Sequence, residues 1–153
     1  MKKLHIGFGQ INPTVGDFES NADKICSYIQ KAESDGLDLI MFPELSVSGY
    51  PVWDLANKKS FVEKNLKVFG GIVRFTRQKQ VAVALGFIDQ GKDAGSKSYN
   101  ALAVLKAGRV IHKQCKQLLP TYDVFLEEIF FTPGKAGGLF SLNGIPIGAT
   151  ICE

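Results

Sequence analysis

The apolar positions of this chain follow two periods, and each period predicts one kind of secondary structure. Short apolar or alternating runs, which are typical of strands, occupy residues 4–10, 37–42, 81–88, 99–105, 109–112, 140–142 and 145–152. Two longer stretches repeat their apolar residues at steps of three and four, which predicts helices. Strands alternate with helices first and form hairpins later, so the pattern predicts one α/β domain with a mixed sheet.

The two predicted helices have recognisable ends. The first covers residues 17–35, and Gly36 stands where a left-handed residue commonly ends a helix. Its apolar face consists of Ala22, Ile25, Ile29 and Ala32. The second begins at Ser60, because Ser60 and Glu63 have the spacing of a capping box. Its apolar face consists of Phe61, Leu66, Phe69, Ile72 and Val73.

The second half of the chain carries hairpin signals. The Lys106-Ala107-Gly108 stretch separates two predicted strands, and Asn143-Gly144 is the strongest short-range hairpin signal in the chain. Residues 114–138 are predicted to form a long loop. The last predicted strand, residues 145–152, reads as buried and runs as far as Cys152.

Composition and charge narrow the class of protein. The chain has 153 residues, of which 45% are hydrophobic and 22% charged, so it can bury a sizeable core and is not disordered. The 18 Lys and Arg against 15 Asp and Glu give a net charge of only +3. Because the basic residues do not cluster, we expect neither nucleic acid nor a membrane as a partner.

Cysteine usage and the amino terminus favour a cytoplasmic protein. The 3 cysteines cannot all pair within one chain, and the apolar stretch after Met1-Lys2-Lys3 is too short for a secretion signal. His112 and Cys115 lie close in sequence, but two further ligands at suitable spacing are missing, so no metal site is expected. The Gly7-x-Gly9 stretch lacks the third glycine of a dinucleotide-binding turn, so no dinucleotide site is expected there.

Three polar residues follow predicted strands, where open α/β sheets place their binding crevices. Glu44 comes just after the strand at residues 37–42, Lys116 follows the strand at 109–112, and Cys152 ends the last strand. Taken singly, each has a plain structural explanation. They could be a solvated turn carboxylate, a surface lysine and an inert core thiol.

Taken together, the segments that carry these residues resemble the nitrilase, or carbon–nitrogen hydrolase, superfamily. They are residues 42–51 (FPELSVSGYP), 116–120 (KQLLP) and 148–153 (GATICE). That superfamily carries a Glu-Lys-Cys triad in these motifs and in this order. The likeness covers essentially the whole chain, including residues 10–17 (QINPTVGD) and 99–105 (YNALAVL).

Within the superfamily, the flanking residues are most similar to the glutaminase domains of glutamine-dependent NAD synthetases. The similar stretches are residues 48–55 (SGYPVWDL) and 119–127 (LPTYDVFLE). The second stretch usually reads LPNYGVFDE in that family, so Thr121, Asp123 and Leu126 depart from the pattern.

The resemblance implies a fold and a set of roles. The fold is a four-layer α-β-β-α sandwich, of which residues 1–153 supply the first part, so the domain is expected to be incomplete at its C-terminus. Cys152 is then the nucleophile, Glu44 the general base and Lys116 the oxyanion stabiliser, with Lys113 as the rival for the lysine role. Glu127 is an additional active-site glutamate that orients Lys116 and belongs to the substrate site, and Tyr122 and Phe125 line the substrate pocket.

The same resemblance implies the reaction and its partners. The domain would hydrolyse glutamine without a cofactor of its own and pass ammonia to a C-terminally fused synthetase domain that uses ATP and Mg. The full protein would be a homo-oligomer. Two alternatives remain open: a free-standing amidase or carbamoylase that acts on a small amide, and an inactive fragment or binding module of this fold. The isolated chain is expected to be poorly active, because half a sandwich cannot enclose a pocket.

Overall fold

The centre of the molecule is a five-stranded mixed sheet in the order β1-β2-β3-β4-β5. The structure is a computed structural model that describes residues 2–91 and 97–152. The strands are β1 (Ile6–Phe8), β2 (Leu39–Met41), β3 (Ala82–Asp89), β4 (Tyr99–Lys106) and β5 (Arg109–Cys115). Strands β1, β2 and β3 run parallel, whereas β4 and β5 continue as antiparallel neighbours. The mixed sheet predicted from the sequence is confirmed.

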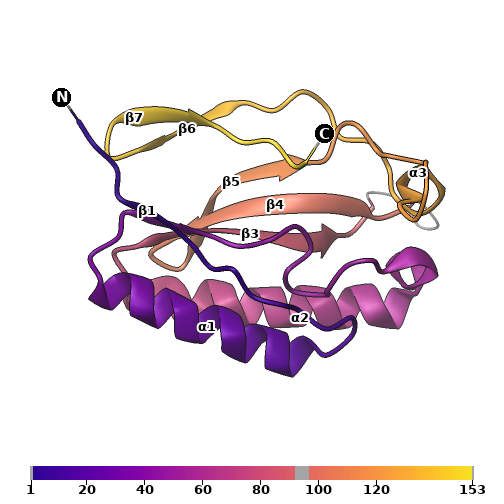
Figure 1. Cartoon of the computed structure of the whole chain (residues 1–153), viewed down its shortest axis with the longest axis horizontal. Coiled ribbons are helices and arrows are strands. Elements are labelled where there is room, and N and C mark those ends of the chain that lie inside the picture. The colour runs from indigo at the N-terminus through magenta and orange to yellow at the C-terminus, as the bar shows by residue number, and fades with distance from the viewer. Residues whose placement is uncertain (1, 92–96, 153) are drawn as a thin grey trace.

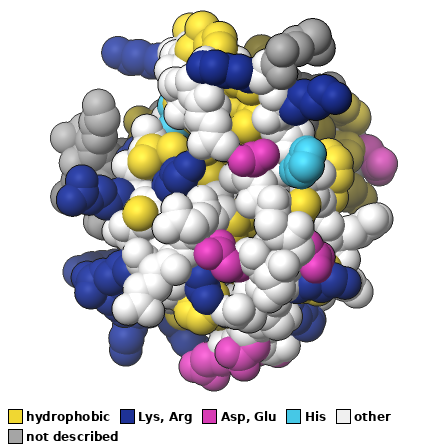
Figure 2. All heavy atoms as spheres, turned by 90° about the vertical axis from the view of Figure 1, so that its left-hand side faces the viewer, with side chains coloured by type: hydrophobic (Ala, Val, Ile, Leu, Met, Phe, Trp, Pro, Cys, Tyr) yellow, Lys and Arg dark blue, Asp and Glu magenta, His cyan; other side chains and the backbone are white. Residues whose placement is uncertain are grey.

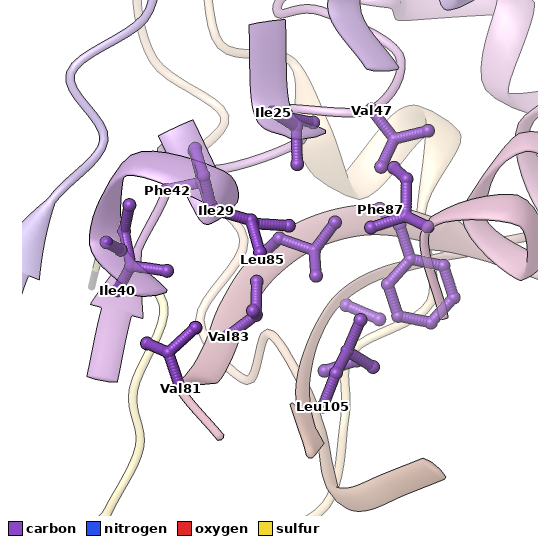
Figure 3. Close-up of a cluster of buried hydrophobic side chains, with 14 of the residues drawn as sticks. Ile25, Ile29, Ile40, Phe42, Val47, Val81, Val83, Leu85, Phe87 and Leu105 are labelled. Atoms are coloured by element: carbon purple, nitrogen blue, oxygen red, sulfur yellow. The ribbon is translucent and has the colours of Figure 1, made fainter. Parts of the chain in front are cut away.

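Two long helices cover one face of this sheet (Figure 1). They are α1 (Phe18–Ser34) and α2 (Lys59–Phe75), and the apolar stripe predicted for each packs into the main core. Figure 3 shows Ile29 of α1 next to Leu85 of β3, and Ile25 and Val83 belong to the same buried cluster. Gly36 has a φ of 68°, as its predicted place beyond the helix end requires.

A hairpin made of β6 (Leu139–Leu142) and β7 (Ile145–Gly148) covers part of the opposite face of the sheet. Leu142 is buried against Ala82, Ala84 and Val104, with Phe140 and Ile147 packed around them. The described residues therefore contain a helical layer, a five-stranded sheet and a two-stranded hairpin that belongs to a further β layer. That is the first part of the predicted α-β-β-α sandwich.

The surface shows no single dominant charge on the face drawn in Figure 2, where Lys and Arg side chains lie among Asp and Glu side chains. Within the described residues, no helix is both long enough and apolar enough to cross a membrane.

The predicted capping box at Ser60 and Glu63 is wrong. Helix α2 begins at Lys59, and the carbonyl of Lys58 already accepts hydrogen bonds from the amides of Phe61 (2.9 Å) and Val62 (3.1 Å). Ser60 therefore lies inside the first turn, where its side chain cannot cap the helix.

The predicted extent of the last strand is also wrong. Strand β7 ends at Gly148, opposite the first residue of β6, so the chain has no ladder partner beyond that point in this hairpin. Cys152 consequently lies outside any strand and is exposed. The predicted loop at residues 114–138 is shorter than expected as well, because β5 reaches Cys115 and a short helix, α3 (Glu127–Phe130), interrupts it. A 3-10 turn at Trp53–Asn57 was not predicted.

Candidate active site

Three chain segments that are distant in sequence meet at one end of the sheet. Glu44 follows β2, Asn100 lies at the start of β4, and Lys116 follows β5. Because β2 and β5 end where the antiparallel β4 begins, these residues become neighbours. Asn100 shares a sheet face with Leu102 and Val104, which pack toward the β6–β7 hairpin. The site thus forms on the face that α1 and α2 leave uncovered.

Glu44 is held in place by a tight loop that lies against β3. The amide of Phe42 donates to the carbonyl of Ala84 (2.8 Å), and the amide of Val47 donates to the carbonyl of Gly86 (3.2 Å). A Cβ atom at Gly86 would come within 2.2 Å of the Leu45 nitrogen and 3.0 Å of the Glu44 Cα. Only glycine lets β3 approach the backbone that carries Glu44.

Replacing Gly86 by alanine should therefore displace Glu44. We expect the rate of the reaction catalysed at this site to fall by about 10²-fold, because a misplacement of about 1 Å at a reacting group has that effect. The matched control is Gly138→Ala, since a Cβ atom at Gly138 meets nothing within 4 Å. Steady-state rates of the two variants, measured in a complete domain and normalised to folded protein by circular dichroism, provide the check. Equal rates would show that the contact between β3 and the Glu44 loop is not critical.

Lys116 is the buried centre of the site. Its amide donates to the carbonyl of Asn100 (2.8 Å), which extends the β4–β5 ladder, and its residue surface is only 2% exposed. Its Nζ contacts Oε1 of Glu44 at 2.8 Å and Oε1 of Glu127 at 3.0 Å. Burial alone would lower the pKa of Lys116, but hydrogen bonds and charge from both carboxylates outweigh it and raise the pKa. An ammonium group has three donors, so one N–H remains for a substrate oxygen.

Glu127 and Tyr50 form the far side of this cluster. Glu127 is the first residue of α3, is 2% exposed, and accepts hydrogen bonds at Oε1 from Lys116 and from the Tyr50 hydroxyl (2.9 Å). Burial raises the pKa of Tyr50, and the hydrogen bond to Glu127 raises it further. Tyr50 is therefore a neutral donor at physiological pH. Oε2 of Glu127 is buried without a hydrogen-bond partner in the described part of the chain.

Asn100 completes the arrangement, because its Nδ2 donates to Oε1 of Glu44 at 2.5 Å. Neither Asn100 nor Tyr50 was assigned a role from the sequence, although both lie in the segments that carry the family resemblance. The available signal for Asn100 was a polar side chain at the head of the apolar run 101–105. Tyr50 gave no local signal that separates it from the other aromatic residues of the chain.

Cys152 lies near this cluster but is not bonded to it. Within residues 2–91 and 97–152, no hydrogen bond joins its thiol to Glu44 or Lys116. Cys152 is the smallest of the electrostatic contributions that raise the pKa of Tyr50, after burial and the hydrogen bond to Glu127, so the two groups lie within electrostatic reach. Cys152 has a φ of 50°, a strained conformation for a non-glycine residue of the kind that concentrates at functional sites.

The predicted pocket residues form an aromatic group beside the cluster. The rings of Tyr122 and Phe125 meet edge to face with centroids 5.3 Å apart, and Phe125 lies 6.5 Å from the ring of Tyr50. Tyr122 is 58% exposed, so its ring is accessible. The indole of Trp53 donates to the carbonyl of Val124 (3.2 Å) and ties this loop to the 3-10 turn.

Lys113, the rival for the lysine role, lies elsewhere. Its Nζ pairs with Oδ2 of Asp89 at 2.5 Å, and its side chain is about half exposed. The hydrogen bond to Asp89 raises its pKa against the opposing effect of burial. Because residues 113 and 116 are an odd number of positions apart along an extended backbone, their side chains leave on opposite faces.

No disulfide joins the described cysteines, which are Cys26, Cys115 and Cys152. Among the described residues, no group of three or more His, Cys, Asp or Glu side chains could hold a metal ion. The polar groups that the described site brings together are the carboxylates of Glu44 and Glu127 and the ammonium group of Lys116, with the Cys152 thiol nearby.

A layered α/β fold that gathers a glutamate and a buried lysine near an accessible cysteine is typical of hydrolases with a thiol nucleophile. Residues 5–153 match the carbon-nitrogen hydrolase family, and the chain belongs to that family.

The chain is similar over its full length to two curated relatives, both glutamine-dependent NAD(+) synthetases. It is 42% identical over 153 residues to the protein of Thermotoga maritima and 35% identical over 153 residues to that of Acinetobacter baylyi. It spans only 26% and 27% of their lengths, about a quarter in each case.

Solved structures confirm the fold. The glutamine-dependent NAD+ synthetase of Acinetobacter baumannii, solved with ADP, superposes with a TM-score of 0.90 at 34% identity, covering 99% of this chain and 28% of that one. The NitN amidase of Neterenkonia sp. AN1 superposes with a TM-score of 0.81 at 20% identity, covering 94% of this chain and 55% of that one. At that identity the likeness concerns the fold alone.

Proposed function

We propose that this chain forms the larger part of the catalytic site of a glutaminase domain, which hydrolyses the side-chain amide of glutamine. The observation that carries the proposal is the pairing of the buried Lys116 with Glu44 and Glu127, beside a strained, accessible Cys152. The similarity of the whole chain to part of two glutamine-dependent NAD synthetases favours glutamine among the possible amides.

The first half of the proposed reaction forms a thioester. Glu44 takes the proton of the Cys152 thiol, and the sulfur attacks the carboxamide carbon, so that the carbonyl oxygen becomes an oxyanion. The free N–H of Lys116 donates to this oxygen, and one such donor contributes about 2.7–4 kcal/mol to transition-state stability. When the C–N bond breaks, Glu44 returns the proton to the leaving nitrogen, and ammonia departs.

The second half regenerates the enzyme. Glu44 takes a proton from water while the hydroxide attacks the thioester carbon, and Lys116 again stabilises the oxyanion. The C–S bond then breaks, the sulfur recovers its proton, and glutamate is released. Glu127 and Tyr50 hold Lys116 in place throughout, and Tyr122 and Phe125 form the wall of the glutamine pocket.

The wider context of the activity follows from the relatives. We propose that the ammonia is used by a synthetase domain that follows on the same polypeptide and requires ATP and Mg. We also propose that the full protein is a homo-oligomer. A reducing cytoplasm suits the activity, because the nucleophile must remain a free thiol.

The test uses a fusion protein in which these 153 residues replace the matching segment of the Thermotoga maritima relative. We expect the fusion to release ammonia from glutamine but not from short aliphatic amides or N-carbamoyl compounds. The reverse preference would instead favour a free-standing amidase or carbamoylase. Absence of turnover by a folded fusion would indicate an inactive module. The isolated chain serves as a second sample and should be poorly active; robust turnover by it would contradict the expected need for further residues.

A further inference from the structure

The side chain of Asn100 is buried with one of its polar atoms unpaired. The residue is 1% exposed, its Nδ2 donates to Glu44, and its Oδ1 is buried without a hydrogen-bond partner among the described residues. Burying an unpaired amide oxygen is unfavourable, and an apolar side chain of the same shape would avoid it. The contribution of Asn100 to folding therefore does not explain why an amide stands here.

The amide does have one specific effect, which is on the carboxylate of Glu44. Asn100 and Lys116 both donate to Oε1, at 2.5 and 2.8 Å. No donor from the described residues contacts Oε2, and the Glu44 side chain keeps 23% of its surface exposed. Two hydrogen bonds use both lone pairs of Oε1, so Oε2 is the oxygen left to accept a proton.

We propose that Asn100 is a positioning residue that selects Oε2 of Glu44 as the proton-accepting atom. This inference rests on the proposed glutaminase function, in which Glu44 takes the thiol proton. The terminal torsion of a glutamate is broad, so a carboxylate with one partner can rotate and present either oxygen. Asn100 removes that freedom, because a second donor fixes the plane of the carboxylate.

Lys116 cannot do this alone. Its ammonium group is shared between Glu44 and Glu127, and its remaining N–H is needed by the oxyanion. The backbone carbonyl of Asn100 also accepts a hydrogen bond from the backbone amide of Lys116 at 2.8 Å. One residue therefore sets the position of both the base and the oxyanion donor, through its side chain and its backbone respectively.

Two substitutions in the fusion protein test the proposal. Asn100→Leu keeps the approximate shape but removes both the donor and the unpaired oxygen. We expect kcat for glutamine to fall about 10²-fold with KM changed less than about twofold, and the melting temperature to stay the same or rise. Asn100→Asp keeps the shape more closely, but its carboxyl can donate to Glu44 only while protonated. Its activity should be greatest at a lower pH than that of the parent protein.

The matched control is Asn65→Leu, because Asn65 is a buried amide with an ordinary structural role. Its Nδ2 donates to the carbonyl of Ile88 at 2.6 Å, and its Oδ1 accepts from the amide of Ile88 at 3.4 Å. This substitution should lower the melting temperature while kcat per folded molecule is unchanged.

The outcomes separate the two proposals. If the parent fusion hydrolyses glutamine and Asn100→Leu retains its kcat, the role of Asn100 is wrong and the glutaminase function stands. Asn100 is only structural if two results are found together. Asn100→Leu would lower the melting temperature and lose activity only because less of the protein is folded, and Asn100→Asp would keep the pH profile of the parent. A parent fusion that is folded but does not hydrolyse glutamine overturns both.

Discussion

Replacing Cys152 by alanine is expected to abolish glutamine-dependent NAD synthesis by the fusion protein and to leave synthesis from added ammonia intact. Without the sulfur no thioester can form, and removal of a catalytic nucleophile lowers kcat by about 10⁶-fold in the best-studied case. Ammonia supplied in solution bypasses the hydrolysis step. The two rates, measured on the same preparation, therefore separate loss of the nucleophile from loss of folding.

The control for Cys152→Ala is Cys26→Ala. Cys26 lies on α1, packs against the main core, and has a pKa raised first by burial and then by Asp23, which makes it a poor nucleophile. That variant should keep its glutamine-dependent rate. A Cys152→Ala protein that still releases ammonia from glutamine would show that the nucleophile has been assigned to the wrong residue.

Replacing Lys116 by methionine is expected to have the largest effect on stability. The substitution leaves the buried carboxylate of Glu127 without its cation, and breaking a buried ion pair in this way costs about 3–5 kcal/mol of unfolding free energy. It also removes the oxyanion donor, so turnover should fall by about 10²–10³-fold. Urea denaturation and steady-state kinetics on the fusion protein measure the two effects separately.

A second substitution should separate stability from activity. The double variant Lys116→Met, Glu127→Gln has no buried charge at position 127. The amide introduced there can still accept a hydrogen bond from the Tyr50 hydroxyl, so most of the lost stability should return. Turnover should not return, because the oxyanion donor is still missing. Recovery of turnover in the double variant would contradict the role of Lys116.

Lys113→Met is the matched control for this series. Lys113 pairs with Asp89 near the surface, and exposed ion pairs contribute at most about 1 kcal/mol. The variant should retain both stability and turnover. A large loss of turnover in Lys113→Met alone would restore that residue as the candidate catalytic lysine.

The sequence was sufficient for the features that depend on local periodicity. The apolar stripes at Ile25 and Ile29 on α1 and at Phe69 and Ile72 on α2 predicted which helix faces are buried, because a helix repeats its neighbours every three to four residues. Buried strands and the turn at Asn143-Gly144 were equally local. The ends of elements were less certain. The boundaries of α2 and β7 depend on which partner groups are within hydrogen-bonding reach.

The candidate site needed more than periodicity. Glu44, Lys116 and Glu127 came from a family resemblance, and the structure places Lys116 within hydrogen-bonding distance of both carboxylates. Tyr50 and Asn100 were not assigned roles, because nothing in their own segments shows that one faces Glu127 and the other Glu44. Such contacts join residues more than 50 positions apart and form only when the sheet is assembled.

The sequence by itself therefore determined the class of fold, the helix faces that form the core, and the residue types available for carbon–nitrogen bond hydrolysis. Only the tertiary structure shows that Lys116 contacts both Glu44 and Glu127, that Gly86 leaves space for the Glu44 loop, and that Asn100 shares Oε1 of Glu44 with Lys116. The physical reason is the range of the interactions. Burial patterns depend on residues that are close in sequence. Hydrogen bonds of about 3 Å between distant segments depend instead on the register of separate strands.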